Sequence, residues 1–595
     1  MNAMTRQYRD PELPYFAQLD SERVLIIIDN FDHSRKLSSK GRTELLNQLN
    51  SRYKRLCILG DDSLGLEELA TGQLGKGALS EFSFFDLDDF GNKLRYNLIE
   101  KWYMIGVEYT VDEHEIRNKV ERAAQLISGL LGKSYLPSIP IIILTFLQSL
   151  DSESPISSSA GTYGSLYEVL ITQELVKIRS LKFNLDLRRT YLSEVAFWMF
   201  IHNKTVISDL EWSEFHVSYA REYHSATEKN ELRDDVINLG LIKKSDESFS
   251  FNYSAQYYYF VALYFENNLH KRAEVKGIIK GLFENFHREE HSSVWLFLTH
   301  LSKDPFIVDS VVEHAKSLFS SLPTASFGAE MSVFDEIYKS VPQIVLEDIG
   351  YRERNERRFE QMDRHEEMEN NDSVKDLDDN CKENEQVRQL LSSIKTLDVL
   401  GQLIKNFHGS LRGVEKFKLV KETYDLGLRT IQALLAEVAE NSDVLLKEIV
   451  ELIRKKHPEL VIRGEIEEKV KSAVFFWVEL GCFGLVKRIS QAVGHAALEE
   501  TYREVGFSND SNAYSLIQLS VQLDSKGAPM NELDHWAGAF KNNAFCERLT
   551  KMLFRNHLYI FSIPEIKRQR ICSKLGIEMR PASTNDMLLP GGKRI

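Results

Sequence analysis

Residues 24–32 join an apolar run to two carboxylates. The run, VLIIIDNFD, ends in Asp29 and Asp32, which are three positions apart. Such a run is typical of a buried parallel strand, whose carboxyl end presents polar side chains to a ligand. The sequence therefore predicts a strand whose end presents Asp29 and Asp32 to a ligand.

The strand resembles the Walker B element of P-loop NTPases, in which the first Asp holds the Mg²⁺ that bridges the nucleotide phosphates. The resemblance implies that Asp29 is the candidate Mg²⁺ ligand of this chain. The phosphate-binding loop of that class, GxxxxGK[ST], does not occur in the sequence. A partial mimic, GQLGKG at 72–77, has no Ser or Thr after its lysine. Because phosphoryl transfer depends on the charge stabilisation that this loop provides, we expect no ATP hydrolysis by this chain alone and assign no catalytic residue.

The composition is typical of a globular protein in a reducing compartment. The chain has 595 residues, of which 43% are hydrophobic and 27% charged, and its net charge is -14. Its five cysteines lack CxxC spacing, which argues against a disulfide framework or a zinc site. The N-terminal residues lack the apolar core of a signal peptide, and the longest apolar stretch, 139–147, is about half a membrane span. We expect a cytoplasmic protein without nucleic-acid or membrane partners.

The first hundred residues read as a short α/β part. A helix separates the first strand from a second one, RLCILGDD, which ends at Asp61 and Asp62. A third candidate strand at 79–87 precedes a helix that Asp88 or Asp89 can cap. Strands that alternate with helices indicate a parallel sheet.

The rest of the chain reads as helical, so the predicted fold class is mostly α. Helical periodicity begins near 111. Helices in 187–265 enclose IKKSDESFSF, which predicts a β-hairpin at about 242–253 and so a winged-helix pattern. The highly charged stretch 351–389 is typical of a solvated helix or a disordered linker. Amphipathic helices then fill 390–576.

Three segments in this order resemble the STAND class of P-loop NTPases, and within it the bacterial NACHT-type proteins. They are VLIIIDNFD, SYLPSIPIIILTFLQSL and FSFNYSAQYYYFVALYF. Relatives of this kind often carry an N-terminal calcineurin-like phosphoesterase, whose metal-ligand motif does not occur here. The resemblance implies that Pro140 contacts the adenine side of the nucleotide. It also implies that Tyr253 takes the place of a winged-helix histidine that reaches the phosphate, and that Asp61 and Asp62 stand where relatives have a polar sensor.

The resemblance implies ATP or ADP with Mg²⁺ as cofactors of complete relatives. In this chain the candidate cofactor-binding residues are Asp29, Asp32, Asp61, Pro140 and Tyr253. A tyrosine supplies no cation and the phosphate loop is missing, so it stays open whether any nucleotide binds. A shortened gene product or a subunit split from its phosphate-binding half would each explain the missing loop.

The resemblance also divides the chain into seven segments. They are the C-terminal part of a NACHT-like NTPase domain (1–110), a helical domain (111–185), a winged-helix domain (186–268), a second helical domain (269–350), a charged linker (351–389), a C-terminal helical domain (390–580) and a flexible tail (581–595).

Several motifs also have a plainer interpretation. HREEH matches the HxxEH pattern of inverted zinc peptidases, and on a helix His287 and His291 would share a face near Glu290. The segment is charged on every side, so a solvated helical face is the favoured interpretation. Asp29 could equally start a solvated turn, and Pro140 could simply begin a helix.

Two functions fit these observations. The first is a regulatory STAND/NACHT-like signalling NTPase fragment, the sensor and switch part of a system such as bacterial antiviral defence. Its C-terminal helices would bind a protein partner, or the chain would self-associate. The alternative is a helical scaffold or adaptor with a purely structural NTPase remnant. A third and weaker hypothesis is a hydrolase with an unrecognised site.

Overall fold

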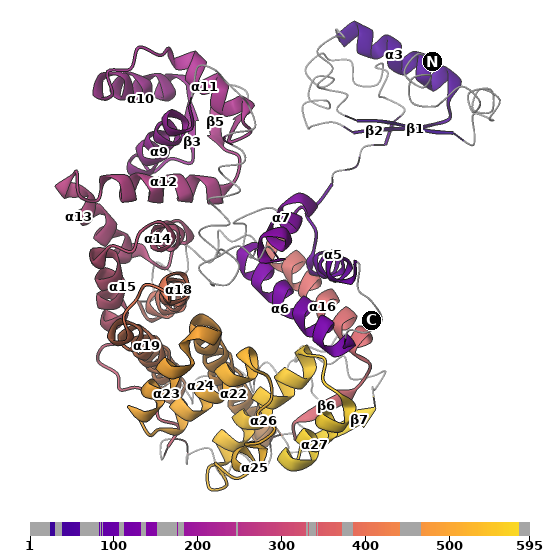
Figure 1. The fold of residues 1–595 in the computed structure, drawn as a ribbon, viewed down its shortest axis with the longest axis vertical. Helices are drawn as coiled ribbons and strands as arrows, with labels where there is room; N and C mark the ends of the chain where they lie inside the picture. Colours follow the sequence, from indigo (N-terminus) through magenta and orange to yellow (C-terminus); the bar gives the residue numbers. More distant parts are fainter. Residues whose placement is uncertain are drawn as a thin grey trace. The chain divides into compact units, whose positions relative to one another are not determined.

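The computed structural model describes residues 24–29, 39–59, 82–83, 85, 87–105, 112–131, 138–151, 175, 184–245, 248–328, 331, 341, 343–371, 385–440, 451 and 466–581. Its elements are mostly helices (Figure 1), which confirms the mostly α fold class. The chain divides into two compact units, Met1–Asp88 and Asp89–Ile595. None of the helices in the described ranges has the length and apolar character needed to cross a membrane.

The first unit contains the two predicted strands and the helix between them. β1 (Leu25–Ile28) and β2 (Arg55–Ile58) form a parallel pair, and α3 (Ser39–Arg52) connects them. Leu46 of α3 is buried against the apolar side chains of one face of the sheet. The alternation of outward and inward side chains along each strand produces this single packed face.

The other face of the sheet differs from the prediction of a buried strand. Leu25 and Ile27 point away from α3 and are 56% and 62% exposed. A parallel sheet normally has both faces covered, but here the described residues cover only one. Of the third candidate strand at 79–87, the described residues are not in a strand.

The second unit begins with three helices that pack together. They are α5 (Asn92–Met104), α6 (Glu113–Leu131) and α7 (Pro140–Asp151). We predicted that α5 belongs to the NTPase-like segment 1–110. It lies instead in the second unit, because Tyr96 and Ile99 of α5 are buried in the same core as α6 and α7.

A small antiparallel sheet follows, in the order β3-β5-β4. β4 and β5 form the predicted hairpin, with Ile242 opposite Phe251. The elements of this part are α9 (Leu185–Ile201), β3 (Val206–Ser208), α10 (Asp209–Glu222), α11 (Lys229–Asn238), β4 (Ile242–Ser245), β5 (Ser248–Phe251) and α12 (Ser254–Asn268).

Helices from α12 onward pack on one another in turn. α12 packs on α14, α14 on α18, α18 on α22, α22 on α24 and α24 on α26. The helices are α13 (Ala273–Gly281), α14 (Glu289–Leu301), α15 (Pro305–Ser317), α18 (Glu385–Phe407), α19 (Gly413–Glu440), α22 (Ile466–Val493), α23 (Glu499–Phe507), α24 (Asn512–Ser525), α25 (Leu533–Trp536), α26 (Ala544–Ile560) and α27 (Glu565–Leu575), with short 3₁₀ turns η3 (Leu282–Asn285) and η6 (Ala496–Leu498).

The charged stretch 351–389 is only partly what we expected. Its first part forms α16 (Tyr351–Asn371), which packs on α5 and buries Phe359, so it does have a buried face. Just before it, β6 (Val345–Asp348) pairs in parallel with β7 (Glu578–Pro581), near the end of a region predicted to be all helical. Residues 372–384 and the predicted tail after Pro581 lie outside the described residues.

Candidate functional site

The first candidate residue, Asp29, directly follows β1 and is exposed. Because β1 and β2 are parallel, Asp29 lies at the edge where β2 also ends. The N–H of Leu59 donates to the carbonyl of Ile28 at 2.8 Å, so pairing continues to the last residue of each strand. Asp32 and Asp61 lie outside the described residues. Asp29 is thus at a strand end, where a ligand-facing carboxylate is expected.

Pro140 and Tyr253 both stand at helix starts. Pro140 is the exposed first residue of α7, a position that suits proline because the first N–H of a helix needs no partner. Tyr253 is the N-cap of α12. Its backbone N–H donates to the side-chain oxygen of Gln256 at 3.3 Å. Each residue therefore has a local structural role, and a nucleotide contact by either stays a prediction.

The helices around the small sheet are fixed by buried polar contacts. Arg188 of α9 donates to both oxygens of Asp235 in α11, at 2.7 and 2.8 Å. The Trp212 indole N–H donates to the Tyr191 hydroxyl at 2.9 Å. These pairs tie α9 to α10 and α11, and they satisfy polar groups that would be costly to bury alone.

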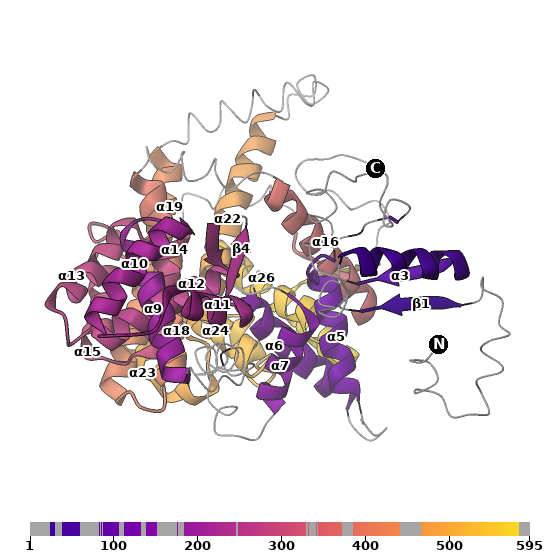
Figure 2. The same ribbon diagram turned by 90° about the horizontal axis from the view of Figure 1, so that it is seen from above.

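The aromatic helix α12 is the centre of this part of the chain. It packs between α9 and α14, as can be followed in Figures 1 and 2. The rings of Phe197 and Tyr264 stack with centroids 3.7 Å apart, and Tyr259 meets Phe297 edge to face at 5.9 Å. Most of the aromatic side chains of α12 are buried in the core, namely those of Tyr257, Tyr259, Phe260, Tyr264 and Phe265.

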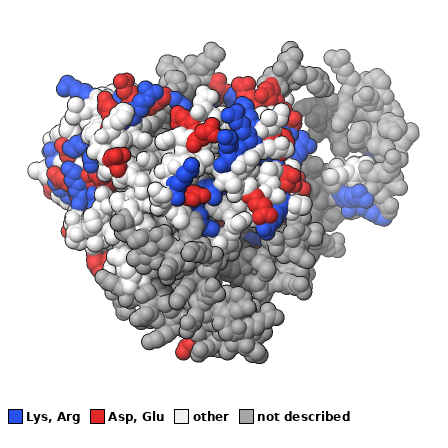
Figure 3. Space-filling model, turned by 90° about the horizontal axis from the view of Figure 1, so that it is seen from below, with Lys and Arg blue, Asp and Glu red and all other residues white. Residues whose placement is uncertain are grey.

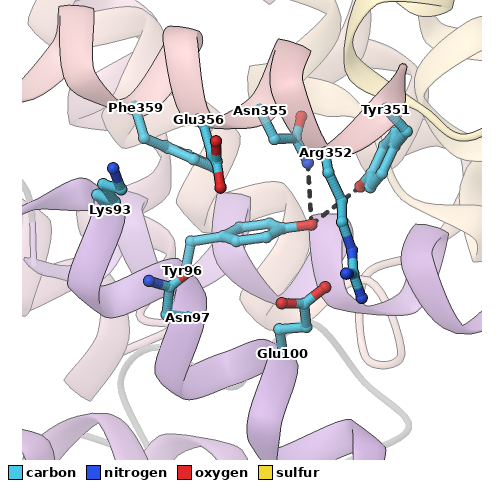
Figure 4. Close-up of a pocket in the computed structure, with 9 residues that line it drawn as sticks. All are labelled: Lys93, Tyr96, Asn97, Glu100, Tyr351, Arg352, Asn355, Glu356 and Phe359. Carbon is cyan, nitrogen blue, oxygen red and sulfur yellow. Dashed lines mark hydrogen bonds between the residues drawn. The ribbon is translucent and has the colours of Figure 1, made fainter.

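A second group of residues lies between α5 and α16, around a pocket of about 240 Å³ (Figure 4). At its floor the hydroxyls of Tyr96 and Tyr351 are 2.9 Å apart. The Asn355 amide donates to the Tyr96 hydroxyl at 3.0 Å. Phe359 packs on the Tyr96 ring, with centroids 4.6 Å apart. Burial raises the pKa of Tyr96, so it stays a neutral hydrogen-bonding group.

Asp363 of α16 caps the start of α5. Its carboxylate accepts from the backbone N–H groups of Asn92 and, at 3.2 Å, Lys93. We predicted that Asp88 or Asp89 would supply this cap. Asp89 accepts instead from the Ser138 N–H at 2.9 Å. The cap therefore comes from a residue 271 positions away, which no local spacing in the sequence reveals.

Charged pairs extend the contact between α16 and the α5–α6 helices. The Lys93 ammonium lies 2.7 Å from Glu360 at the surface, where such a pair contributes little. Arg358 donates at 2.6 Å to Glu121 of α6, whose side chain is only 3% exposed. The Arg117 guanidinium lies over the Tyr351 ring, 5.2 Å from its centroid. α16 is thus attached mainly by polar and charged groups.

The C-terminal helices contact the same region. The Asn118 side chain donates to the Ser562 carbonyl at 3.1 Å and accepts from the Ser562 N–H at 2.8 Å. Arg568 of α27 donates to Asp348 and to the Glu347 carbonyl, both at 2.9 Å, beside the β6–β7 pair. The first helices of the second unit and its last elements are therefore joined directly.

The HREEH segment does not form the predicted helical face. α14 begins at Glu289, so His287 precedes the helix and does not share a helical face with His291. His291 is partly buried, with Nδ1 3.1 Å from the Leu282 carbonyl, and Glu290 accepts from the Tyr257 hydroxyl at 3.0 Å. Across the described residues no three His, Cys, Asp or Glu side chains come together as a metal site.

Comparison with known proteins bears on the small-sheet region. Residues 205–261 match the family model described as Novel STAND NTPase 4. The matched range runs from β3 into α12 and so contains all three strands of the sheet. A comparison with curated proteins found no similar sequence. This part of the chain is therefore similar to the corresponding part of STAND NTPases.

Proposed function

We propose that the chain is a regulatory protein of the STAND class, related to the NACHT-type proteins, whose C-terminal helices sense a protein partner. The observation that carries the proposal is the match of 205–261 to a STAND family model in a region with three strands between helices. In this proposal α9–α12 form a winged helix that packs against its neighbours and changes position with the regulatory state.

The side chains of α11 favour a packing role for this winged helix over DNA binding. In a DNA-binding winged helix the second helix of the helix-turn-helix enters the major groove. Here Lys229 of α11 lies 2.9 Å from Asp209, and Arg233 also pairs with Asp209. On another face of the molecule, seen from below in Figure 3, Lys and Arg side chains also lie among Asp and Glu side chains. We therefore propose no nucleic-acid partner.

In this proposal ATP or ADP with Mg²⁺ would bind at the end of β1. Asp29 is the residue of this chain that would hold the Mg²⁺. Its position at the carboxyl end of a parallel strand supports this assignment. Because the sequence lacks the phosphate-binding loop, hydrolysis by the chain alone is not part of the proposal.

An ATPase assay tests the catalytic part of the proposal. We expect the purified chain to release phosphate from ATP·Mg²⁺ no faster than an Asp29→Ala variant, because neither has the charge stabilisation that the reaction needs. Turnover that the Asp29→Ala substitution abolishes would contradict the proposal.

A scaffold or adaptor with a structural NTPase remnant is the second candidate. The exposed face of the β1–β2 sheet, with Leu25 and Ile27, favours it, because such a face suits contact with another protein. Calorimetry can separate the two candidates. Binding of ATP or ADP to the wild-type chain but not to Asp29→Ala would favour a regulatory STAND protein over a scaffold.

A further inference from the structure

We propose that α16 is a releasable latch on α5, which detaches as one segment while the helices around α12 stay packed. The regulatory meaning of this latch rests on the proposed function. The detachment itself does not, because it follows from the contacts between α16 and its neighbours.

The first argument is that the latch is held mostly by polar groups. Asp363 caps α5, Arg358 pairs with Glu121, and Asn355 donates to Tyr96. Such groups exchange their partners for water when two helices separate, so each hydrogen bond contributes little net free energy. For the buried pair of Arg358 and Glu121, the cost of removing both charges from water offsets much of their attraction. α12 and α14 instead bury apolar and aromatic side chains against each other, and water offers those side chains no replacement.

The second argument is that closing the latch buries polar atoms without partners. Arg354 is 4% exposed and lies over the rings of Tyr351 and Tyr559, and it forms no ion pair with any described residue. Its Nε and the Oδ1 of Asn355 have no hydrogen-bond partner among the described residues. Burial and the nearby Arg568 lower the pKa of Arg354 to about 10. Opening would hydrate these groups, which offsets part of what the closed contact gains.

The third argument is the way α16 is connected. β6 precedes it by two residues and pairs with β7, and Arg568 donates to Asp348 at the end of β6. A movement of the C-terminal elements would therefore act directly on the first turn of α16. From near the middle of α16, Asp363 caps α5, the helix that follows the first unit in the sequence. The latch thus connects the proposed sensor with α5, the first helix of the second unit.

Detachment has a defined local consequence. The N–H groups of Asn92 and Lys93 would lose the Asp363 carboxylate, so the first turn of α5 would fray together with α16. The pocket in Figure 4 would disappear, because its lining comes from both helices. A local opening of this kind is measurable by hydrogen exchange.

Hydrogen–deuterium exchange of the full-length chain without nucleotide tests the latch. The variant is Asp363→Ala, and the control is Ser511→Ala, which removes the N-cap of α24, where Ser511 Oγ accepts from Tyr514 N–H within one element. We expect Asp363→Ala to speed exchange at least tenfold in the first turn of α5 (92–95) and in 345–371 together, and to leave 254–301 unchanged. The control should speed exchange only at the start of α24.

Three results would overturn the proposal. Faster exchange confined to the first turn of α5 would make Asp363 a simple cap. Faster exchange throughout 89–581 would show that α16 opens only together with the common core. Unchanged exchange would show that the Asp363 contact does not hold α16 on α5. As a second measurement on the wild-type chain, hydrogen exchange at low urea concentrations should show that 345–371 opens with a smaller free energy than 254–301, and equal opening free energies would also overturn the latch. ATPase results do not enter any of these outcomes.

Discussion

His314 of α15 is a partly buried titratable group that has no charged partner among the described residues. Its ring stacks on Phe283 with centroids 4.2 Å apart and meets Phe286 at 5.1 Å, and its Nε2 has no hydrogen-bond partner among the described residues. Burial lowers its pKa to about 4 from 6.5. As pH falls from 6.5 to 4, the unfolded chain takes up a proton at this residue and the folded chain does not. Stability is therefore lost across that window.

A His314→Phe variant should lose less stability on acidification. The histidine accounts for up to about 3 kcal/mol between pH 6.5 and 4, and phenylalanine removes this contribution while keeping the aromatic packing. Urea denaturation at pH 7, 5.5 and 4.5 measures it. His365→Phe, at an exposed position of α16, is the control. Identical pH dependence of His314→Phe and wild type would contradict the assignment.

Replacing one residue of the buried ion pair between Glu479 and Arg548 should destabilise the protein more than replacing both. Glu479 of α22 has no exposed side-chain surface, and Arg548 of α26 donates to it at 2.8 Å. Arg548→Met leaves a buried charge unpaired and should cost about 3–5 kcal/mol. The double variant Glu479→Leu/Arg548→Met removes both charges and should recover most of that loss. Thermal denaturation that shows additive losses would contradict this account.

Residue roles could be predicted from the sequence only where they depend on near neighbours. Asp29, for example, directly follows the strand that the apolar run 24–28 predicted. The cap by Asp363 could not be predicted, because both partners are ordinary charged or helical residues and only the tertiary fold brings them together. Asp88 and Asp89 were predicted instead, because they shortly precede α5 in the sequence and aspartate is a favoured N-cap residue.

Among the elements, those with a clear local period were predicted well. β1, β2 and the β4–β5 hairpin follow from apolar runs and a polar turn. The β6–β7 pair was missed because β7, Glu578–Pro581, is polar and ends in proline, so it carries no strand signal of its own. α16 was read as solvated because its few buried residues, such as Phe359, are dispersed among charges.

Close packing of α18 on α22 depends on Gly401. A Cβ at this position would lie 2.6 Å from the carbonyl oxygen of Ala492, a backbone atom that cannot move by side-chain rotation. Gly401→Ala should therefore destabilise the protein by about 1–3 kcal/mol. Gly277→Ala, in the middle of α13 with no atom near its added Cβ, should stabilise it by about 0.5–1 kcal/mol. Calorimetry measures both, and equal effects would contradict the close approach.

For the whole molecule, we expect limited proteolysis to cut first within 370–384. The sequence there has few apolar residues, and α16 ends at Asn371. We inferred from the sequence that this segment separates two helical blocks. The structure indicates that the blocks share a core, because α14 packs on α18 and β6 pairs with β7. The two fragments should therefore stay together in native gel filtration and separate only in denaturant. Fragments that separate under native conditions would contradict the shared core.

The central claim is that the chain is a regulatory protein held closed by contacts that its C-terminal part makes with the helices after the first unit. Light scattering coupled to gel filtration tests it most directly, on wild type, Ser511→Ala and the latch variant Asp363→Ala/Asn355→Ala. We predict the mass of a single chain for the first two and a concentration-dependent higher mass for the latch variant, because release allows self-association. A latch variant that exchanges rapidly at 345–371 yet keeps the mass of one chain at every concentration would contradict the claim.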